Sequence, residues 1–285
     1  MTQLDLCQRW RSRRSSYVVP DTRIDPRLFE VAAIDHEAAL AFVLEHHYSG
    51  RYSSARARFG LFRRDALVGV AVFSVGGGPE VLSILPCDAA VELGRFVLLD
   101  GVEANGETYF LARCFVRRGG FGGVVSFSDD IPRTTLAGDI VFKGHLGIIY
   151  QAHNALYTGR GAVRTKYLLP DGQEFSARAA QKIRARERGW RGAAKPLVAA
   201  GAPPLGELDD SRAWLRIWLP RVARPLRHPG CHRYIWPLDR ATRLALPDHL
   251  RERRVEVSPY PKVMFKPTDP RRRAARRVCP KETAA

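Results

Sequence analysis

The sequence is poor in cysteine and has no pair of cysteines placed to hold a metal. Its 285 residues include five cysteines, and none of them forms a Cys-x-x-Cys pair: Cys7, Cys87, Cys114, Cys231 and Cys279. This scatter excludes a cysteine-based zinc site and a disulfide framework, because both need organised pairs. It indicates a reducing cytosol.

Long apolar runs are also missing. No segment approaches the roughly 20 apolar residues that are needed to cross a bilayer. The arginines between Met1 and Tyr17 are followed by no apolar stretch, so they do not read as a signal peptide. We therefore expect a cytoplasmic protein with no membrane partner.

Acidic residues are few relative to basic ones. Lysine and arginine number 46 against 29 aspartates and glutamates, which gives a net charge of +17. Such a charge attracts polyanions, and the planar arginine fork pairs two oxygens of a phosphate. An arginine-rich genome with a merely soluble surface is the plain alternative. Nucleic acid is the favoured partner.

The apolar pattern predicts an α/β fold. It predicts strands at 28–34, 58–62, 66–75, 91–99, 123–127, 165–169 and 232–238, and helices at 36–46, 107–118, 145–157 and, heavily cationic, across 177–200. Asp35 and Asn105 are expected to cap the first two helices. An antiparallel hairpin comes first and helix-alternating strands follow, so we expect a mixed, mostly antiparallel central sheet flanked by helices.

We expect one large domain. Residues 1–27 are a basic lead-in, residues 28–246 form the catalytic domain with a basic helical insertion at 177–200, and residues 247–285 are a basic, poorly ordered tail.

The end of the first helix carries the first candidate catalytic residues. His47 is expected to act as a base or metal ligand, and Tyr48 to stack on a nucleotide base, because polar groups at element ends often line sites. The alternative is a histidine that caps the helix end electrostatically.

A second group follows the short buried strand at 123–127. Ser126, Ser128 and Asp129 lie at its C-terminal end, the edge where open α/β sheets place ligands. Asp129 is the candidate general base, or the residue that orients one. Ser-Asp-Asp before Ile-Pro is equally good turn chemistry, so both interpretations stand.

Tyr150 and Asn154 are four residues apart on the helix expected at 145–157, and they therefore share a face. A core tyrosine is the alternative for Tyr150. His46, His47, Asp129 and His153 offer nitrogen and oxygen ligands to a metal such as iron, but no motif of metal-ligand spacing supports a particular ion.

Two patches are candidates for contact with double-stranded DNA. The first lies in the cationic helical segment and comprises Lys182, Arg184, Arg186, Arg188, Trp190 and Arg191. The second includes Arg233 and Tyr234, where cations alternate with aromatic rings that suit a flipped nucleotide. A solvated helix face is the alternative for the first patch.

Several short motifs, in one order and spacing, resemble the Mom family of phage DNA-modification proteins over residues 30–240. The motifs are His46–Gly50, Glu92–Val97, Asn105–Thr108, Val125–Asp129 and Gly147–Asn154. Members of that family resemble GNAT acyltransferases in fold. The resemblance implies a phage or prophage protein of a bacterial host that adds a carbamoylmethyl (glycinamide-type) group to the N6 amine of adenine in DNA, which protects the DNA from restriction.

The same resemblance implies an activated acyl donor, acetyl-CoA or another. It assigns cofactor contacts to Arg95, Phe96, Val97, Asn105, Gly106 and Thr108, and it gives Tyr150 the role of protonating the departing thiolate. One stretch departs from the GNAT pattern. Asp100–Gly106 replaces the usual phosphate loop, its glycines are spaced differently, and Asp100 and Glu103 repel phosphate, although a helix N-terminus there still attracts anions.

Three functions remain: a Mom-like DNA-modifying transferase, an acetyl-CoA-dependent GNAT N-acyltransferase acting on a small amine or protein, and a basic DNA-binding protein without catalysis. The charge and the altered phosphate loop count against the second function. Polar residues at the ends of successive elements count against the third.

Overall fold

The chain forms two compact units. The structure, a computed structural model, describes residues 10–11, 14–15, 23–117 and 120–262. The first unit comprises the described residues up to Ser128, His145–Gly159 and those from His232 onward, and the second comprises Asp129–Gly144 and Arg160–Cys231. Arg271–Arg277 and most of the expected basic lead-in lie outside the described residues.

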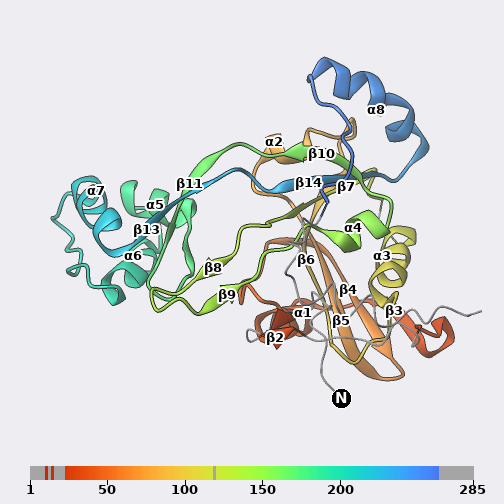
Figure 1. The fold of residues 1–285 in the computed structure, drawn as a ribbon, viewed down its shortest axis with the longest axis horizontal. Coiled ribbons are helices and arrows are strands. Elements are labelled where there is room, and N and C mark those ends of the chain that lie inside the picture. The colour runs from red at the N-terminus through yellow and green to blue at the C-terminus, as the bar shows by residue number, and fades with distance from the viewer. Residues whose placement is uncertain (1–9, 12–13, 16–22, 118–119, 263–285) are drawn as a thin grey trace, which may run out of the picture. The chain divides into compact units, whose positions relative to one another are not determined.

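A seven-stranded sheet is the centre of the first unit (Figure 1). Its order is β10-β14-β7-β6-β5-β4-β3, with β3 Phe29–Ala33, β4 Ala55–Arg63, β5 Ala66–Ser74, β6 Ala90–Leu98, β7 Gly123–Ser128, β10 Leu156–Arg160 and β14 His232–Pro237. Strands β3 to β6 pair antiparallel, as do β7 and β14, whereas β6 and β7 pair parallel. The expected mixed, mostly antiparallel sheet is confirmed.

Helices flank this sheet. They are η1 Pro26–Leu28, α1 His36–His46, α2 Pro79–Leu82, α3 Gly106–Val116, α4 Ile148–Ala152 and α8 Arg240–Glu252, while β1 Trp10–Arg11 and β2 Arg14–Ser15 form a separate pair. Asp35 caps α1, as expected, by accepting from the Ala38 N–H at 2.7 Å. No helix among the described residues is long and apolar enough to span a membrane.

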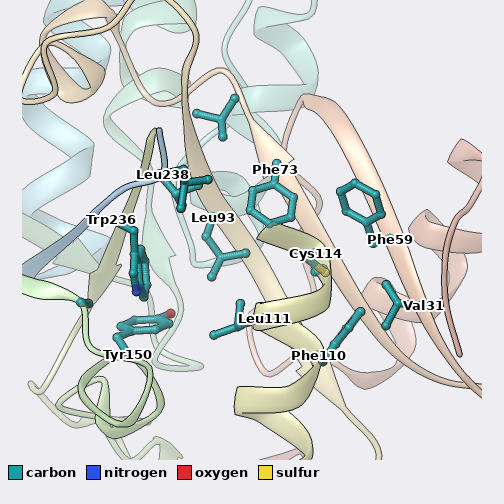
Figure 2. Packing of buried hydrophobic residues seen from close by; sticks show 14 of the residues in the cluster. Val31, Phe59, Phe73, Leu93, Phe110, Leu111, Cys114, Tyr150, Trp236 and Leu238 are labelled. Atoms are coloured by element: carbon teal, nitrogen blue, oxygen red, sulfur yellow. The ribbon is translucent and has the colours of Figure 1, made fainter. Parts of the chain in front are cut away.

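The two faces of the sheet have separate apolar cores. Phe73 and Leu93 pack with Phe110 and Leu111 of α3 on one face (Figure 2). On the other face Val43 of α1 packs with apolar residues of β5 and β6. Burial of these side chains holds α1 and α3 to opposite faces of the sheet. Each large apolar side chain that is fully buried stabilises the fold by roughly 1.5–3 kcal/mol.

The second unit has its own core. Strands β12 Glu174–Phe175, β11 Arg164–Leu168 and β13 Arg224–His228 form one sheet, β8 Arg133–Thr134 pairs with β9 Ile140–Phe142, and the helices are α5 Ala177–Arg184, α6 Trp190–Ala199 and α7 Ser211–Val222. Ile183, Leu197 and Leu215 bring the three helices together, each at 3% exposure or less.

Several elements differ from the sequence expectation. The helix expected at 145–157 is confined to α4, because Gly147 and Asn154 take left-handed backbone angles on either side of it. The segment 177–200 is two helices, broken where Arg186 and Gly189 also have positive φ. Helix α8 runs past the boundary expected at 247, and the second unit takes in much more than the insertion expected at 177–200.

Candidate active site in the central sheet

The strands β6 and β7 run together only over their first residues. Their parallel pairing covers Ala90–Glu92 and Gly123–Val125. Beyond it β6 continues beside β5 and β7 beside β14, and the Ser126 hydroxyl donates to the Leu93 carbonyl at 3.3 Å. Polar side chains at this point lie where two neighbouring strands separate.

A β-bulge in β6 follows this point. Val72 of β5 pairs with Arg95, and the next residue, Phe73, pairs with Leu93, so that Gly94 is one residue more than the partner strand has. A bulge of this kind breaks the alternation of side chains and re-aims those beyond it.

The bulge brings Glu92 and Arg95 to one face of the sheet. Glu92 pairs with Ser74 and Arg95 with Val72, both even-numbered positions of β5. Val72 packs with Val43 of α1. The carboxylate and the guanidinium therefore lie on the face that α1 covers.

The C-terminal end of α1 contributes His47 and Tyr48. The Nδ1 atom of His47 accepts from the Ser49 backbone N–H at 3.2 Å, so the neutral ring carries its proton on Nε2. Burial, aided by the charge of Arg95, lowers the pKa of His47 to about 3. A neutral imidazole is not an electrostatic cap. Tyr48 is 43% exposed, and its ring lies 4.3 Å from that of His47.

Arg95 is fixed by backbone carbonyls. Its Nε donates to the Arg51 carbonyl at 2.6 Å and its Nη1 to the Gly94 carbonyl at 2.5 Å. Burial lowers the pKa of Arg95, and the opposing effects come from Tyr48 and Glu92. Among the described residues, no backbone carbonyl accepts a hydrogen bond from the Nη2 group of Arg95.

Glu92 is a half-buried carboxyl and the one acidic residue of β6. Burial raises its pKa, while the charge of Arg95 and a hydrogen bond from the Gly77 backbone oppose the rise. The pKa of Glu92 is therefore shifted toward neutral pH, which suits a group that exchanges protons during a reaction.

Tyr150 of α4 completes the group. Its side chain is 6% exposed, and its ring packs edge-on against Trp236 with centroids 5.6 Å apart. Its hydroxyl hydrogen-bonds with Ser126, and burial raises its pKa, so the phenol stays protonated. The ring of Tyr150 is thus part of the core, as the alternative interpretation expected, whereas its hydroxyl belongs to the candidate site. Asn154 lies beyond the end of α4 at φ 55° and does not share its face.

We call these residues the central cluster: His47, Tyr48, Glu92, Arg95, Ser126 and Tyr150. Electrostatic interactions connect Arg95 with Tyr48, Glu92 and Tyr150. Glu92 was not among the site residues predicted from the sequence. The available signal was a lone acid in the run Val91-Glu92-Leu93. His145, whose ring lies 6.4 Å from that of Tyr150, was also missed.

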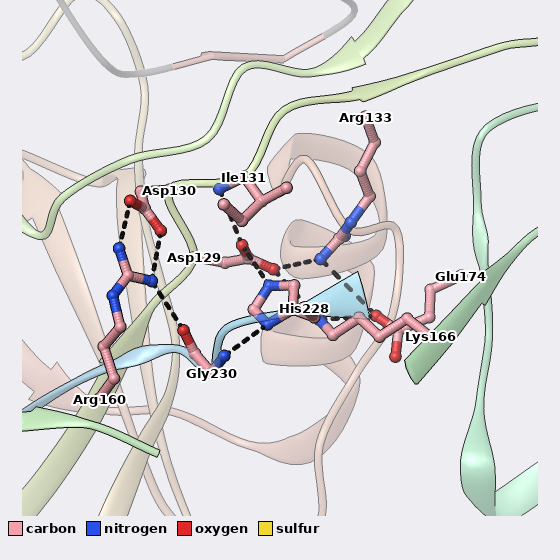
Figure 3. Close-up of polar contacts among 9 residues, drawn as sticks. All are labelled: Asp129, Asp130, Ile131, Arg133, Arg160, Lys166, Glu174, His228 and Gly230. Carbon is pink, nitrogen blue, oxygen red and sulfur yellow. Dashed lines mark hydrogen bonds and ion pairs between the residues drawn. The ribbon is translucent and has the colours of Figure 1, made fainter. Parts of the chain in front are cut away.

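Asp129 belongs to a different group of charges, in the second unit (Figure 3). Its carboxylate accepts from the Ile131 N–H at 3.0 Å, from His228 Nε2 at 2.9 Å, from Lys166 at 3.2 Å and from Arg133. Glu174 balances the charge of Lys166, whose Nζ atom lies 3.0 Å from Oε2 of Glu174. We call Asp129, Arg133, Lys166, Glu174 and His228 the Asp129 network.

The charges of this network do not suit proton transfer. Burial raises the pKa of Asp129, but the bond from His228 and the charges of Arg133 and Lys166 outweigh it and lower the pKa to about 2. Asp129 therefore stays ionised near neutral pH, and the role of general base expected for it does not fit. Ser128, just before it, is buried at 1% exposure.

The side chains present do not fit iron. Within the described residues, the metal-like grouping comprises Asp129, His228 and Cys231. His228 Nδ1 accepts a hydrogen bond from the Gly230 N–H at 3.1 Å. The proton of the ring is therefore on Nε2, which donates a hydrogen bond to Asp129. A cation there would also face Lys166 and Arg133, which repel it. The other expected ligands, His46, His47 and His153, are part of the first unit.

The α3 N-terminus does not fit the phosphates of coenzyme A. Asn105 precedes the helix at φ 68° and makes no side-chain capping bond, because capping needs extended backbone. Glu103 is ion-paired with Arg63 at 2.8 Å, and Glu107 lies in the first turn. Phosphate would meet carboxylates here.

The other expected cofactor contacts have structural partners. Gly106 is buried, and the Thr108 hydroxyl donates to the Asn105 carbonyl at 3.0 Å. Phe96 packs against Phe110 with ring centroids 5.5 Å apart, and Val97 lies in the core beneath α1. These side chains build the fold around the central cluster.

The expected DNA contacts divide into engaged and exposed residues. Arg186 donates to the carbonyls of Gly206 and Asp209 and stacks 4.4 Å from the Trp190 ring, and Arg191 pairs with Glu207. The side chains of Arg184 and Arg188 are exposed, whereas that of Lys182 is half-buried: their contact with DNA stays a prediction.

The second expected patch is inside the first unit. Tyr234 is fully buried and donates to the Leu146 carbonyl at 2.5 Å, so its ring does not reach a nucleotide. Arg233 donates to the Thr158 hydroxyl at 2.8 Å. Both side chains hold β14 in place.

The family model of the Mom protein family matches residues 28–202 of this chain. The chain belongs to the Mom family. Among solved structures, the Mom-family chain is similar to a "Tandem GNAT protein from the clavulanic acid biosynthesis pathway (without AcCoA)", with 10% identity and a TM-score of 0.32 over 53% of this chain and 50% of that one. No curated protein matches it significantly.

Proposed function

We propose that this Mom-family protein is a transferase that modifies DNA by adding a carbamoylmethyl (glycinamide-type) group to the exocyclic N6 amine of adenine, which protects the DNA from restriction. Membership of the Mom family supports DNA modification. The observation that carries the chemistry is the meeting of Glu92, Arg95 and Tyr150 where β6 and β7 separate.

The reaction breaks two bonds, the N–H bond of the amine and the bond to the donor's leaving group, and forms two, the new N–C bond and the bond of the released proton to its acceptor. The amine nitrogen bonds to a carbon of the activated donor, loses a proton, and the donor's leaving group departs with its bonding electrons. In this proposal Glu92 accepts the proton, since its raised pKa makes it a stronger base than an ordinary carboxylate.

Arg95 and Tyr150 act on the donor. The remaining guanidinium protons of Arg95 stabilise negative charge on the donor's oxygen, and burial strengthens that effect. The protonated phenol of Tyr150 donates a proton or hydrogen bond to the leaving group. The carbon that the amine attacks is the methylene carbon beside the donor's carboxamide, because attack at a carboxyl carbon would give an amide rather than a carbamoylmethyl amine. No step runs through the phosphates of coenzyme A, because residues 100–106 do not suit them.

Tyr48 provides a place for the base. Enzymes that modify a base within a duplex flip it out and stack it on aromatic side chains. Tyr48 is the exposed ring of the central cluster, backed by His47 at 4.3 Å. The Nε2–H of His47 is then a hydrogen-bond donor beside that ring, not a base.

The test is mass spectrometry of nucleosides from a plasmid that is co-expressed with the protein. We expect a heavier deoxyadenosine with the wild type and its loss with Tyr150→Phe. Tyr109→Phe is the matched control, since the Tyr109 hydroxyl donates to the Phe29 carbonyl at 3.1 Å outside the central cluster. Unaltered nucleosides from a host that supplies the donor would contradict the proposal, and turnover of acetyl-CoA with small amines would support a GNAT N-acyltransferase instead.

A further inference from the structure

Helix α7 and strand β13 form a cationic surface of the second unit. The stretch Ser211–Cys231 contains five arginines and no acidic residue, and the side chains of all five are exposed: Arg212, Arg216, Arg221, Arg224 and Arg227. We call these residues the α7–β13 arginine surface. It lies beyond residue 202, where the match to the Mom family ends.

The fold of α7 orients this surface. Trp214, Leu215 and Leu219 face the core of the second unit, which leaves the opposite half of the helix to solvent. Arg212 and Arg216 lie one turn apart on that outer half, at a rise of about 6 Å. Arg224 follows directly after the helix, at the start of β13.

An aromatic ring accompanies the cations. The Arg221 guanidinium lies 5.2 Å from the centroid of the Trp218 ring. Stacked arginine and tryptophan present a flat cationic group whose forked N–H donors still face outward, a shape that suits a phosphate.

The arginines of this surface differ from three arginines in and between α5 and α6. There, Arg178 pairs with Glu187, Arg191 pairs with Glu207, and Arg186 is bound by backbone carbonyls. The arginines of the α7–β13 arginine surface form no ion pair with any described residue. The nearby acid, Asp210, is the N-cap of α7, with bonds from the Arg212 and Ala213 N–H groups, and its charge also interacts with Arg216 and Arg212 without forming an ion pair.

We propose that the α7–β13 arginine surface binds the phosphate backbone of double-stranded DNA and is the main electrostatic contact of this chain with its substrate. The choice of DNA as the partner rests on the proposed function. Five exposed arginines that form no ion pair with a described residue complement a duplex, which carries a dense, regular negative charge. A membrane is disfavoured because the apolar face of α7 is already buried in the core, whereas an interfacial helix inserts that face.

The experiment measures the affinity of the full-length protein for a short duplex by fluorescence anisotropy over a series of salt concentrations. The triple variant Arg212→Gln/Arg216→Gln/Arg224→Gln removes three contacts. We expect its log–log salt slope to fall by about 3 and its affinity near 0.1 M salt to drop roughly 100-fold. Circular dichroism checks that the variant is folded.

A second triple variant controls for net charge. Arg27→Gln/Arg178→Gln/Arg251→Gln loses the same charge from exposed arginines that are paired with Asp25, Glu187 and Asp248. We expect it to keep the wild-type slope within about one unit. An equal loss in both variants, or no loss in the first, overturns the proposal.

Two further arms separate the alternatives. Loss of binding to vesicles of anionic lipid, with duplex affinity unchanged, would assign the surface to membranes and overturn the proposal. Nucleoside mass spectrometry reports on the chemistry independently. Arginine-dependent binding without a DNA adduct supports the surface and contradicts the proposed function, whereas an adduct with unaltered affinity in the first variant overturns the surface alone.

Discussion

Glu92 and Arg95 project from the same face of β6, although they are three residues apart in a strand whose side chains otherwise alternate. The extra residue Gly94 between them makes the difference. Without the bulge, one of the two charges would point into the core beneath α3. The chemistry that we propose therefore depends on a backbone irregularity as much as on the two side chains.

A substitution at Gly94 tests this dependence. An added Cβ would lie 2.6 Å from Ser74 Oγ and 2.8 Å from Ser53 Oγ, too close without movement of β6. We expect Gly94→Ala to lower the free energy of unfolding by about 1–3 kcal/mol and to abolish DNA modification. Denaturant unfolding and nucleoside mass spectrometry measure the two effects.

Gly101→Ala is the control for Gly94→Ala. A Cβ at Gly101 meets no atom within 4 Å, so we expect a change in stability within about 0.5 kcal/mol and normal modification. If Gly94→Ala is as active as Gly101→Ala, the bulge is not needed for the reaction.

Glu92→Gln should separate catalysis from stability. Because burial raises the pKa of Glu92 in the folded protein, its contribution to stability is largest below the ordinary pKa of about 4.3 and is lost as the pH rises through the folded value. Near neutral pH we therefore expect Glu92→Gln to unfold at higher denaturant concentration than the wild type.

The same substitution should slow modification by roughly 10²- to 10⁴-fold, the usual contribution of a general base. A pH profile of the wild-type rate should show an acidic limb at a pH above the ordinary range of a glutamate, and Glu92→Gln should lack that limb. A variant that is both less stable and equally active would show that Glu92 has a structural role only.

The sequence predicted those features that local signals encode. Asp35 before an apolar stripe marked the start of α1, and the run from Val91 to Leu99 identified the central strand. The bulge at Gly94 was not predictable, because one extra residue becomes visible only against the partner strand β5. The helix expected at 145–157 was too long, since the left-handed turn at Asn154 outweighed the apolar periodicity.

The candidate site was predictable only in part. His47, Tyr48, Arg95, Ser126 and Tyr150 were proposed and lie in one cluster, as their electrostatic and hydrogen-bond interactions indicate. Asp129 was grouped with them because it follows the end of β7. Two of its partners, Lys166 of β11 and His228 of β13, lie far along the chain, and no local pattern indicates such a network.

Asp129→Asn tests that network. The substitution leaves the buried Lys166 and Arg133 with less compensation, and breaking a buried pair costs about 3–5 kcal/mol. The pKa of Asp129 is lowered to about 2, so its contribution is present above the ordinary pKa of about 3.9 and is lost as the pH falls from about 4 to about 2. Denaturant unfolding across this range measures the effect.

Asp248→Asn is the matched control for Asp129→Asn, because the Asp248–Arg251 pair is 74% and 78% exposed. An exposed pair contributes about 0–1 kcal/mol, so we expect little change in stability at any pH. Equal effects of the two substitutions would show that the Asp129 network does not stabilise the second unit.

Substitutions at Arg186 and Arg184 should distinguish a structural arginine, in the turn after α5, from an exposed arginine of α5. Arg186 holds the 206–209 loop through two carbonyls and stacks on Trp190, so Arg186→Gln should lower the free energy of unfolding by about 1–2 kcal/mol. Arg184→Gln, at an exposed position, should change it by less than about 0.5 kcal/mol. Because the N–H donors of Arg186 are already engaged, Arg186→Gln should leave the salt dependence of DNA binding unaltered. A salt slope lower by about 1 with unaltered stability would instead make Arg186 a phosphate contact.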